Sequence, residues 1–167
     1  MKTLIAYSTT HGCTHKIAEQ MSNYLDGEVE LVNLKKHPSP VLSNFDRVII
    51  GGSIHAGQIQ KRVKEFCNQH LGELRTKELG LFITCMETGE TAQKQLIDAY
   101  PEELINNAKI TAYFGGEFDF NRMNFLEKMI VKKVANVKEN TSNVDLESVR
   151  KFSRRMDRVF NPFLFLA

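Results

Sequence analysis

A stretch near the start of the chain, residues 8–14, combines hydroxyl groups and a glycine in a spacing that suits anion binding. It follows the apolar run at residues 4–7 and leads directly into a helical pattern at residues 16–18. A strand that turns into a helix leaves backbone N–H groups free at the helix start, and the helix dipole favours negative charge there. The stretch contains no Lys or Arg. We therefore expect any phosphate here to be held by dipoles and hydroxyl groups rather than by a positive side chain.

A second glycine-rich stretch, residues 51–57, follows a short apolar run at residues 48–50. Two common phosphate motifs are excluded at these loops. The first loop lacks the Gly-Lys-Ser/Thr ending of a P-loop, and no G-x-G-x-x-G follows any expected strand. What remains is a pair of unusual loops, each placed directly after an expected strand.

Apolar runs and helical patterns alternate along the first two thirds of the chain, which is typical of a parallel sheet with helices on both faces. We predict a three-layer, doubly wound α/β fold with five parallel strands in the order 2-1-3-4-5. Strands one and three are then neighbours at the switch point where ligands bind, so the two loops border one crevice. The expected strands cover residues 2–7, 28–34, 48–50, 79–85 and 110–114, and the expected helices cover 14–25, 61–71 and 91–100.

The pattern changes after Gly115 and Gly116, and we expect a single domain over residues 1–167 with an insert at about 117–140. Residues 125–137 have the apolar spacing of a helix that also carries three lysines. Two interpretations stay open for this helix: packing on the sheet edge with solvated lysines, or a surface that contacts a membrane or a partner.

The chain closes with another helical pattern and an apolar tail. Asp145 is expected to cap a last helix whose apolar face extends to Val159 and which ends at Pro162. Its arginine-rich face is interpreted as solvated, and we expect no nucleic-acid binding because no recognised module accompanies it. Residues 163–166 are expected to pack on the domain or on a second subunit of a homodimer.

Composition places the chain among ordinary globular proteins, with 42% apolar and 25% charged residues and a net charge of +2. The positive charge is concentrated at the C-terminal end, where residues 117–167 hold ten Lys or Arg against seven Asp or Glu. The three cysteines, Cys13, Cys67 and Cys85, suit a reducing compartment better than a disulfide scaffold. No apolar run approaches the ~18 residues that span a bilayer. We expect a cytoplasmic protein, soluble or at most peripheral at the inner face of the membrane.

These motifs resemble a known family. Residues 7–14 with Lys16, Ile17 and Ala18 are similar to the FMN phosphate loop of flavodoxins. More specifically, residues 52–57, Gly115-Gly116, the basic helical insert and residues 138–141 resemble the menaquinone-dependent protoporphyrinogen oxidase branch of heme biosynthesis. The resemblance spans nearly the whole chain, and its sharpest motifs are the first two loops.

The resemblance implies FMN as the cofactor and a role for each loop. In the first loop Ser8, Thr9, Gly12 and Thr14 would hold the phosphate, with backbone contributions from Thr10, His11 and Cys13. The second loop would lie along one face of the isoalloxazine ring, and the loop after strand four would border its other side. The second loop comprises Gly52, Ser53, Ile54, His55, Ala56 and Gly57, and the last comprises Cys85, Met86, Glu87, Thr88 and Gly89.

The sequence departs from many flavodoxins in two respects. It has no Trp and no Tyr in the last two loops, so stacking on the flavin would depend on Ile54, His55 or Met86. It also lacks the strong acidity of a typical flavodoxin, which argues against a generic acidic electron shuttle. The basic insert at residues 125–137 would instead suit brief contact with an anionic membrane, where quinones reside.

Side chains of the first two loops and of the loop after strand four could also support other chemistry. His11, Cys13 and His15 alternate, but a structural metal needs a fourth ligand that is not evident, so no metal site is expected. Cys13 could be a reactive thiol at a helix start, although a backbone role is favoured. His55 is the one candidate catalytic side chain, as a hydrogen-bonding or proton-transferring group or merely as a shaper of the loop. Glu87 is interpreted as a solvated loop carboxylate rather than a base.

The sequence therefore predicts an FMN-dependent oxidoreductase that resembles menaquinone-dependent protoporphyrinogen oxidase and passes electrons through FMN to a quinone. The alternative is a non-enzymatic flavodoxin-type electron carrier between partner proteins. A third interpretation, an interaction module without FMN, is disfavoured by the intact hydroxyl residues of the first loop.

Overall fold

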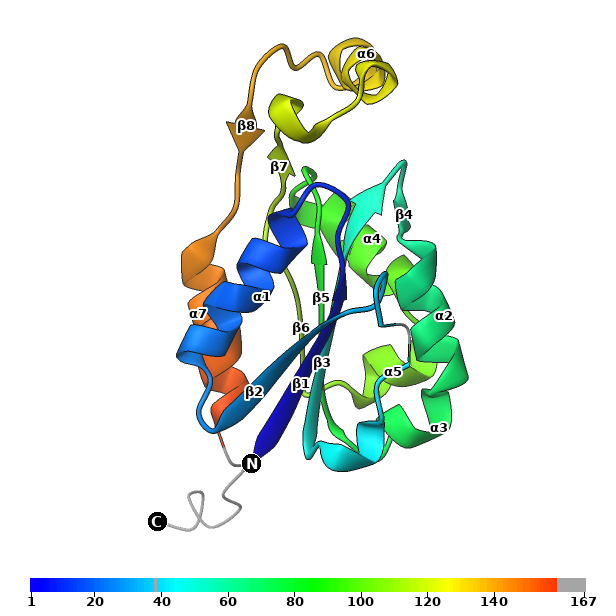
Figure 1. Cartoon of the computed structure of the whole chain (residues 1–167), viewed down its shortest axis with the longest axis vertical. Helices are drawn as coiled ribbons and strands as arrows, with labels where there is room; N and C mark the ends of the chain where they lie inside the picture. The colour runs from blue at the N-terminus through cyan, green and yellow to red at the C-terminus, as the bar shows by residue number, and fades with distance from the viewer. Residues whose placement is uncertain (38, 159–167) are drawn as a thin grey trace.

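A parallel sheet of five strands forms the centre of the protein in a computed structural model that describes residues 1–37 and 39–158 (Figure 1). The strands lie in the order β2-β1-β3-β5-β6, and every neighbouring pair is parallel. This order confirms the predicted 2-1-3-4-5 arrangement. The five strands are β1 (Lys2–Ser8), β2 (Glu28–Asn33), β3 (Arg47–His55), β5 (Glu78–Thr84) and β6 (Ile110–Tyr113).

Helices cover both faces of this sheet (Figure 1). Helices α1 (Cys13–Tyr24) and α7 (Leu146–Asp157) pack on one face, where Ile17, Met21 and Phe152 are buried against the sheet. Asp145 accepts a hydrogen bond from the backbone N–H of Ser148, so it caps α7 as expected. The opposite face carries α2 (Lys61–Gln69), α3 (Leu71–Leu74), α4 (Gly89–Ala99) and α5 (Glu102–Asn107), and a 3-10 turn, Leu42–Asn44, precedes β3.

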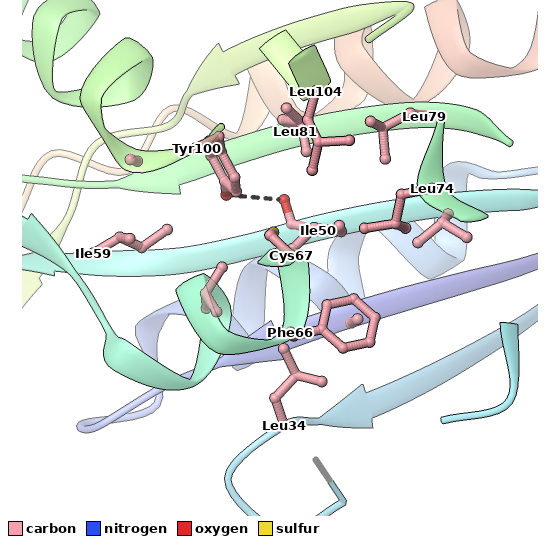
Figure 2. Packing of buried hydrophobic residues seen from close by; sticks show 14 of the residues in the cluster. Leu34, Ile50, Ile59, Phe66, Cys67, Leu74, Leu79, Leu81, Tyr100 and Leu104 are labelled. Atoms are coloured by element: carbon pink, nitrogen blue, oxygen red, sulfur yellow. Dashed lines mark hydrogen bonds between the residues drawn. The ribbon is translucent and has the colours of Figure 1, made fainter. Parts of the chain in front are cut away.

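The core on the second face contains one polar anchor, the hydroxyl group of Tyr100 (Figure 2). Tyr100 follows α4 and is buried among leucine, isoleucine and phenylalanine side chains. Its hydroxyl donates to the backbone oxygen of Ile50, at 3.2 Å, or to that of Phe82, at 2.5 Å. Because these oxygens belong to β3 and β5, the contact joins the two central strands to the helical layer.

The third strand is longer than the sequence indicated. We expected it to end at Ile50 with a loop over residues 51–57, but β3 continues to His55 and returns through a two-residue turn into β4 (Gln58–Ile59). Ala56 and Gly57 both have positive φ, 48° and 76°, which is the backbone of a tight hairpin turn. Antiparallel pairing of Ile54 with Ile59 supplies the hydrogen-bonding partner that extends the strand past its glycines.

The segment after β6 lies beyond the carboxyl ends of the main strands (Figure 1). It consists of β7 (Glu117–Phe118), a 3-10 turn (Phe120–Arg122), α6 (Phe125–Val134) and β8 (Thr141–Ser142), with β7 and β8 paired antiparallel. Gly115 and Asn143 lie against each other where the segment leaves the domain and returns to it. Gly115 has φ +78°, and a Cβ on it would lie 2.1 Å from the carbonyl oxygen of Asn143. We call residues 117–142 the insert.

Two expectations fall partly or wholly outside the described residues. The predicted last helix is present through Asp157, whereas its expected end near Val159 and Pro162 lies outside them. The apolar tail at residues 163–166 also lies outside them.

Candidate functional site

The first loop turns back on itself between β1 and α1. The hydroxyl oxygen of Thr9 accepts a hydrogen bond from the backbone N–H of Gly12 at 2.9 Å, and Gly12, with φ +93°, is the residue before α1. Within the described part of the chain, the backbone N–H groups of Thr10, His11, Cys13 and Thr14 have no protein acceptor. Free N–H groups at a helix start form a site for an anion. The loop therefore fits a phosphate group.

The two hydroxyls that border this loop are buried. Ser8 ends β1 with 3% of its surface exposed, and Thr14 is fully buried in the first turn of α1. The Thr14 hydroxyl lies 3.1 Å from that of Thr84, at the end of β5, and either oxygen can donate. When Thr84 donates, the proton of Thr14 is free for a ligand. The predicted roles of Ser8 and Thr14 in phosphate binding stay predictions.

Gln60 joins the first loop to the β3–β4 hairpin. Its side-chain nitrogen donates to the hydroxyl of Thr10 at 3.1 Å, and its side-chain oxygen accepts from the backbone N–H of Ser53 at 3.0 Å. This bridge holds the two loops beside each other at the switch point between β1 and β3. Gln60 was not predicted to lie at the site, because a lone glutamine before a helix carries no local signal of such a bridge.

His55 lies at the tip of the hairpin and faces His11 of the first loop. The two ring centroids are 6.2 Å apart, and the Ser53 hydroxyl lies 3.0 Å from Nε2 of His55. Desolvation, and secondarily the proximity of His11, lower the pKa of His55. The ring is therefore favoured in its neutral form, which can accept a proton. Its predicted catalytic role stays a prediction.

The loop after β5 forms another wall of the site. The thiol of Cys85 donates to the backbone oxygen of Glu87, and the side chain of Asn143 donates to the backbone oxygen of Met86 at 3.2 Å. Thr88 precedes α4, and Gly89 is the first residue of that helix. The loop is thus attached both to its own helix and to the end of the insert.

These loops and the insert enclose one cavity of about 550 Å³. Eleven of the predicted cofactor residues line it, and the insert closes it from the side opposite the sheet. The predicted residues that line it are Thr9, His11, Cys13, Ser53, Ile54, His55, Ala56, Gly57, Cys85, Met86 and Glu87. Ser8, Thr10, Gly12, Thr14, Gly52, Thr88 and Gly89 do not contribute to its lining.

Lining residues that sequence reasoning missed come from strand ends, helix α4 and the insert. Their contribution follows from tertiary packing, so no local pattern marks them. The apolar side chains among them give the cavity a wall suited to a flat, apolar molecule. These residues are Thr84, Gln95, Gly116, Glu117, Phe118, Met123, Glu127, Ile130, Val131, Val134 and Ala135.

The cysteines at the cavity are held as thiols. Burial, reinforced by Glu117, raises the pKa of Cys13 to about 11, and burial raises that of Cys85 to about 11. A nucleophilic cysteine needs a lowered pKa. The raised pKa therefore argues against a reactive thiol at Cys13, and its backbone role stays a prediction. Among residues 1–37 and 39–158, no group of three or more His, Cys, Asp or Glu side chains is arranged to hold a metal ion.

Helix α6 of the insert buries none of its residues. Five of its six large apolar side chains are half or more exposed, up to 78% for Phe125 and 80% for Val134, and Val131 is partly buried. The interpretation that this helix packs against the sheet edge is therefore wrong for the described residues. No helix within the described residues has the length and apolarity needed to cross a membrane.

Comparison with known proteins defines the class first. The chain shares its fold with flavodoxin 1 from Bacillus cereus, at a TM-score of 0.60 and 14% identity over 93% of this chain and 97% of that one. It also resembles the rubredoxin oxygen:oxidoreductase of Desulfovibrio gigas, at a TM-score of 0.59 and 19% identity. This second match covers 94% of the present chain and 35% of the Desulfovibrio protein.

The family follows from the sequence match. The flavodoxin domain model matches residues 4–145, and the chain therefore belongs to the flavodoxin domain family. Among curated proteins it is similar to the protoporphyrinogen IX dehydrogenase [quinone] of Escherichia coli K12, at 22% identity over 93% of this chain and 94% of that one. The family membership confirms the predicted flavodoxin-like fold and the prediction of FMN as cofactor, and it agrees with a loop whose N–H groups are free for a phosphate.

Proposed function

We propose that the chain is an FMN-dependent oxidoreductase that oxidises a porphyrinogen and passes the electrons to a quinone. The observation that carries the proposal is the cavity shared by the two flavin loops and the insert. On one side it is bordered by the loop expected to hold the phosphate, and on the other by Ile130, Val131 and Val134 of α6. A polar wall for a cofactor and an apolar wall for a flat substrate thus meet in one cavity.

FMN would supply the redox chemistry when bound, as a carrier of two electrons. The protein residues bind and orient it. The first loop would offer N–H groups to the phosphate, the hairpin places His55 in the lining of the cavity, and the insert would limit access of water. Neutral His55 can take up a proton released by the substrate.

Two observations support the porphyrinogen and quinone part of the proposal. The Escherichia coli and Leishmania major relatives are both named protoporphyrinogen IX dehydrogenase [quinone], and both match more than nine tenths of this chain. The exposed apolar face of α6, next to Lys128, Lys132 and Lys133, suits contact with an anionic membrane in which a quinone is dissolved.

The test is a porphyrinogen assay followed by rapid kinetics. Protein saturated with FMN should oxidise protoporphyrinogen when a menaquinone analogue is supplied. The reduced protein should then react with that analogue much faster than free reduced FMN does. A rate no faster than that of free reduced flavin, together with no porphyrin formed, would contradict the proposal.

A second candidate function is one-electron transfer between protein partners, which the fold shared with flavodoxins favours. A carrier stabilises the one-electron form of its flavin. Stepwise reduction under anaerobic conditions would show that form in the absorption spectrum of a carrier. Its absence, together with rapid quinone reduction, would favour the enzyme.

A further inference from the structure

The insert brings a positive side chain to a phosphate loop that has none of its own. Arg122 ends the 3-10 turn of the insert, and its Nη1 donates to the backbone oxygen of His11 at 2.9 Å. The same nitrogen lies over Gly12, because a Cβ built on Gly12 would be only 2.1 Å from it. The guanidinium thus lies against the two residues at the bend of the loop.

The turn that carries Arg122 is anchored on both sides. Asp119 caps it through the N–H of Asn121 and lies 3.4 Å from Nε of Arg122, and Asn140 accepts from the N–H of Phe120 at 2.8 Å. A guanidinium has five N–H donors, and one contact to His11 with one to Asp119 leaves donors unused. The side chain is half exposed, so these donors face solvent beside the loop rather than the core.

The first loop has an electrostatic need that its own residues do not meet. A phosphate monoester carries about −1.5 to −2 charges at pH 7. The dipole of α1 offers roughly half a positive charge at its start. Residues 8–14 contain no Lys or Arg. Lys16, in the first turn of α1, donates to both carboxylate oxygens of Glu117, at 3.0 and 2.9 Å, which is a closer pairing than the 3.4 Å between Arg122 and Asp119.

We propose that Arg122 is a phosphate-recognition residue: it supplies the countercharge for the FMN phosphate and makes the insert part of the cofactor site. The inference rests on the proposed function only in that FMN is the cofactor. It goes beyond that function in naming the source of selectivity for FMN over riboflavin, which lacks the phosphate. Arginine suits this task because its planar fork matches phosphate oxygens.

The experiment measures the dissociation constants of FMN and of riboflavin by quenching of flavin fluorescence, at low and at high salt. It compares the wild-type chain with Arg122→Gln and Arg122→Lys, and with Lys133→Gln as a control that removes one charge from the last turn of α6. Thermal unfolding of each protein without flavin checks that the fold is intact.

The expected result distinguishes the charge of Arg122 from its effect on the shape of the loop. Arg122→Gln weakens FMN binding about fivefold or more at low salt and leaves riboflavin binding within about twofold, because only FMN carries the phosphate. Arg122→Lys retains most of the preference for FMN, and Lys133→Gln changes neither constant by more than about twofold. High salt narrows the difference between wild type and Arg122→Gln.

Three results would overturn the inference. An equal loss of FMN and riboflavin affinity in Arg122→Gln would show that Arg122 only shapes the loop through His11. Unchanged FMN affinity would show that the loop needs no countercharge from the insert. Wild-type protein that binds no FMN would overturn the proposed function and this inference together, whereas the first two results leave the proposed function standing.

Discussion

The side chains of His11 and Glu127 lie 3.3 Å apart, between Nε2 of the first and Oε2 of the second, although 116 positions separate them. The contact joins the first loop of the cofactor site to the first turn of α6. The same oxygen of Glu127 also accepts from the backbone N–H of Asn124, whose side chain in turn accepts from the N–H of Glu127. One carboxylate therefore both starts the helix and attaches it to the loop.

Replacing this carboxylate should loosen the insert without unfolding the domain. The pKa of Glu127 is lowered, first by the backbone N–H of Asn124 and then by His11. A lowered folded pKa means that the contribution is present above the ordinary glutamate pKa and is lost as the pH falls through the folded value. In Glu127→Gln the cap can persist, since glutamine also suits this position, but the charge is lost.

Amide hydrogen exchange over residues 125–134 measures this effect. We expect exchange a few-fold faster in Glu127→Gln than in wild type at neutral pH, and convergence of the two proteins at a pH below the folded value. Ala substitution at the exposed Glu90 of α4 serves as the control and should leave the insert unchanged. Identical exchange in wild type and Glu127→Gln at neutral pH would show that the contact with His11 contributes nothing.

Protonation of His55 should make the rate of the reaction fall on the acid side of its pH profile. Its pKa lies below the ordinary 6.5, mainly through desolvation, so the ring is neutral at neutral pH and takes up a proton only at a pH below that value. Porphyrinogen oxidation by the wild type should therefore slow as the pH falls through this lowered pKa. His55→Gln should be slower at neutral pH, by about a hundredfold if the ring is a positioned base, and should lack that fall in rate on the acid side.

Two comparisons make the His55 experiment decisive. His37→Gln replaces an exposed histidine that does not line the cavity and should retain the wild-type pH profile. FMN affinity is measured in parallel, because a hairpin that merely loses its shape would weaken binding. A variant His55→Gln with an unchanged pH profile and a lower FMN affinity would assign His55 a shaping role.

Much of the fold could be predicted because its signals are local. The apolar runs of β1, β3 and β5 and the helical spacing of α1 and α7 each follow from neighbouring residues, and the strand order follows from the alternation of strands and helices. The β3–β4 hairpin was missed because its turn, Ala56-Gly57, lacks the Asn-Gly or Asp-Gly pair that marks such turns.

The loops of the candidate site were predicted from the sequence, whereas the contributions of the insert and of Gln60 were not. Residues of the first loop share one short stretch with hydroxyls and a glycine, so their chemistry is visible in the sequence. Arg122 is 111 positions from His11, and Gln60 is 50 from Thr10. Contacts at such separations depend on how the insert and the hairpin fold back, which no short pattern encodes. For this reason Arg122 was not expected beside the first loop.

Breaking a buried ion pair at the opposite end of the sheet should lower the stability of the domain. The side chain of Arg47 is fully buried, and its Nη1 lies 2.7 Å from Oδ1 of Asp157 in the last turn of α7. Its Nε lies 3.3 Å from Glu78. In Asp157→Asn the arginine keeps its charge but loses its closest partner, and we expect a loss of about 3 kcal/mol in the free energy of unfolding.

Urea unfolding checks this value against a surface pair. Lys94 and Asp98 are 2.6 Å apart on α4 but mostly exposed, so Asp98→Asn should cost less than about 0.5 kcal/mol. Both variants should bind FMN as the wild type does, because neither position lines the cavity. Equal losses in the two variants would contradict the importance given to burial of Arg47.

The exposed face of α6 should bind anionic membranes. Phe125 and Leu126 are 78% and 62% exposed, and Lys128, Lys132 and Lys133 follow them on the same short helix. Apolar side chains that enter the interface, together with lysines that attract acidic lipid, give binding that salt weakens. Co-sedimentation with vesicles rich in phosphatidylserine should fall about tenfold or more for the double variant Phe125→Ser, Leu126→Ser.

The control is Ile97→Ser, at an exposed apolar position of α4, which should bind as the wild type does. Binding to neutral vesicles should be weak for every protein. Vesicle binding that is equal in all three proteins, or insensitive to acidic lipid, would show that this face serves another purpose.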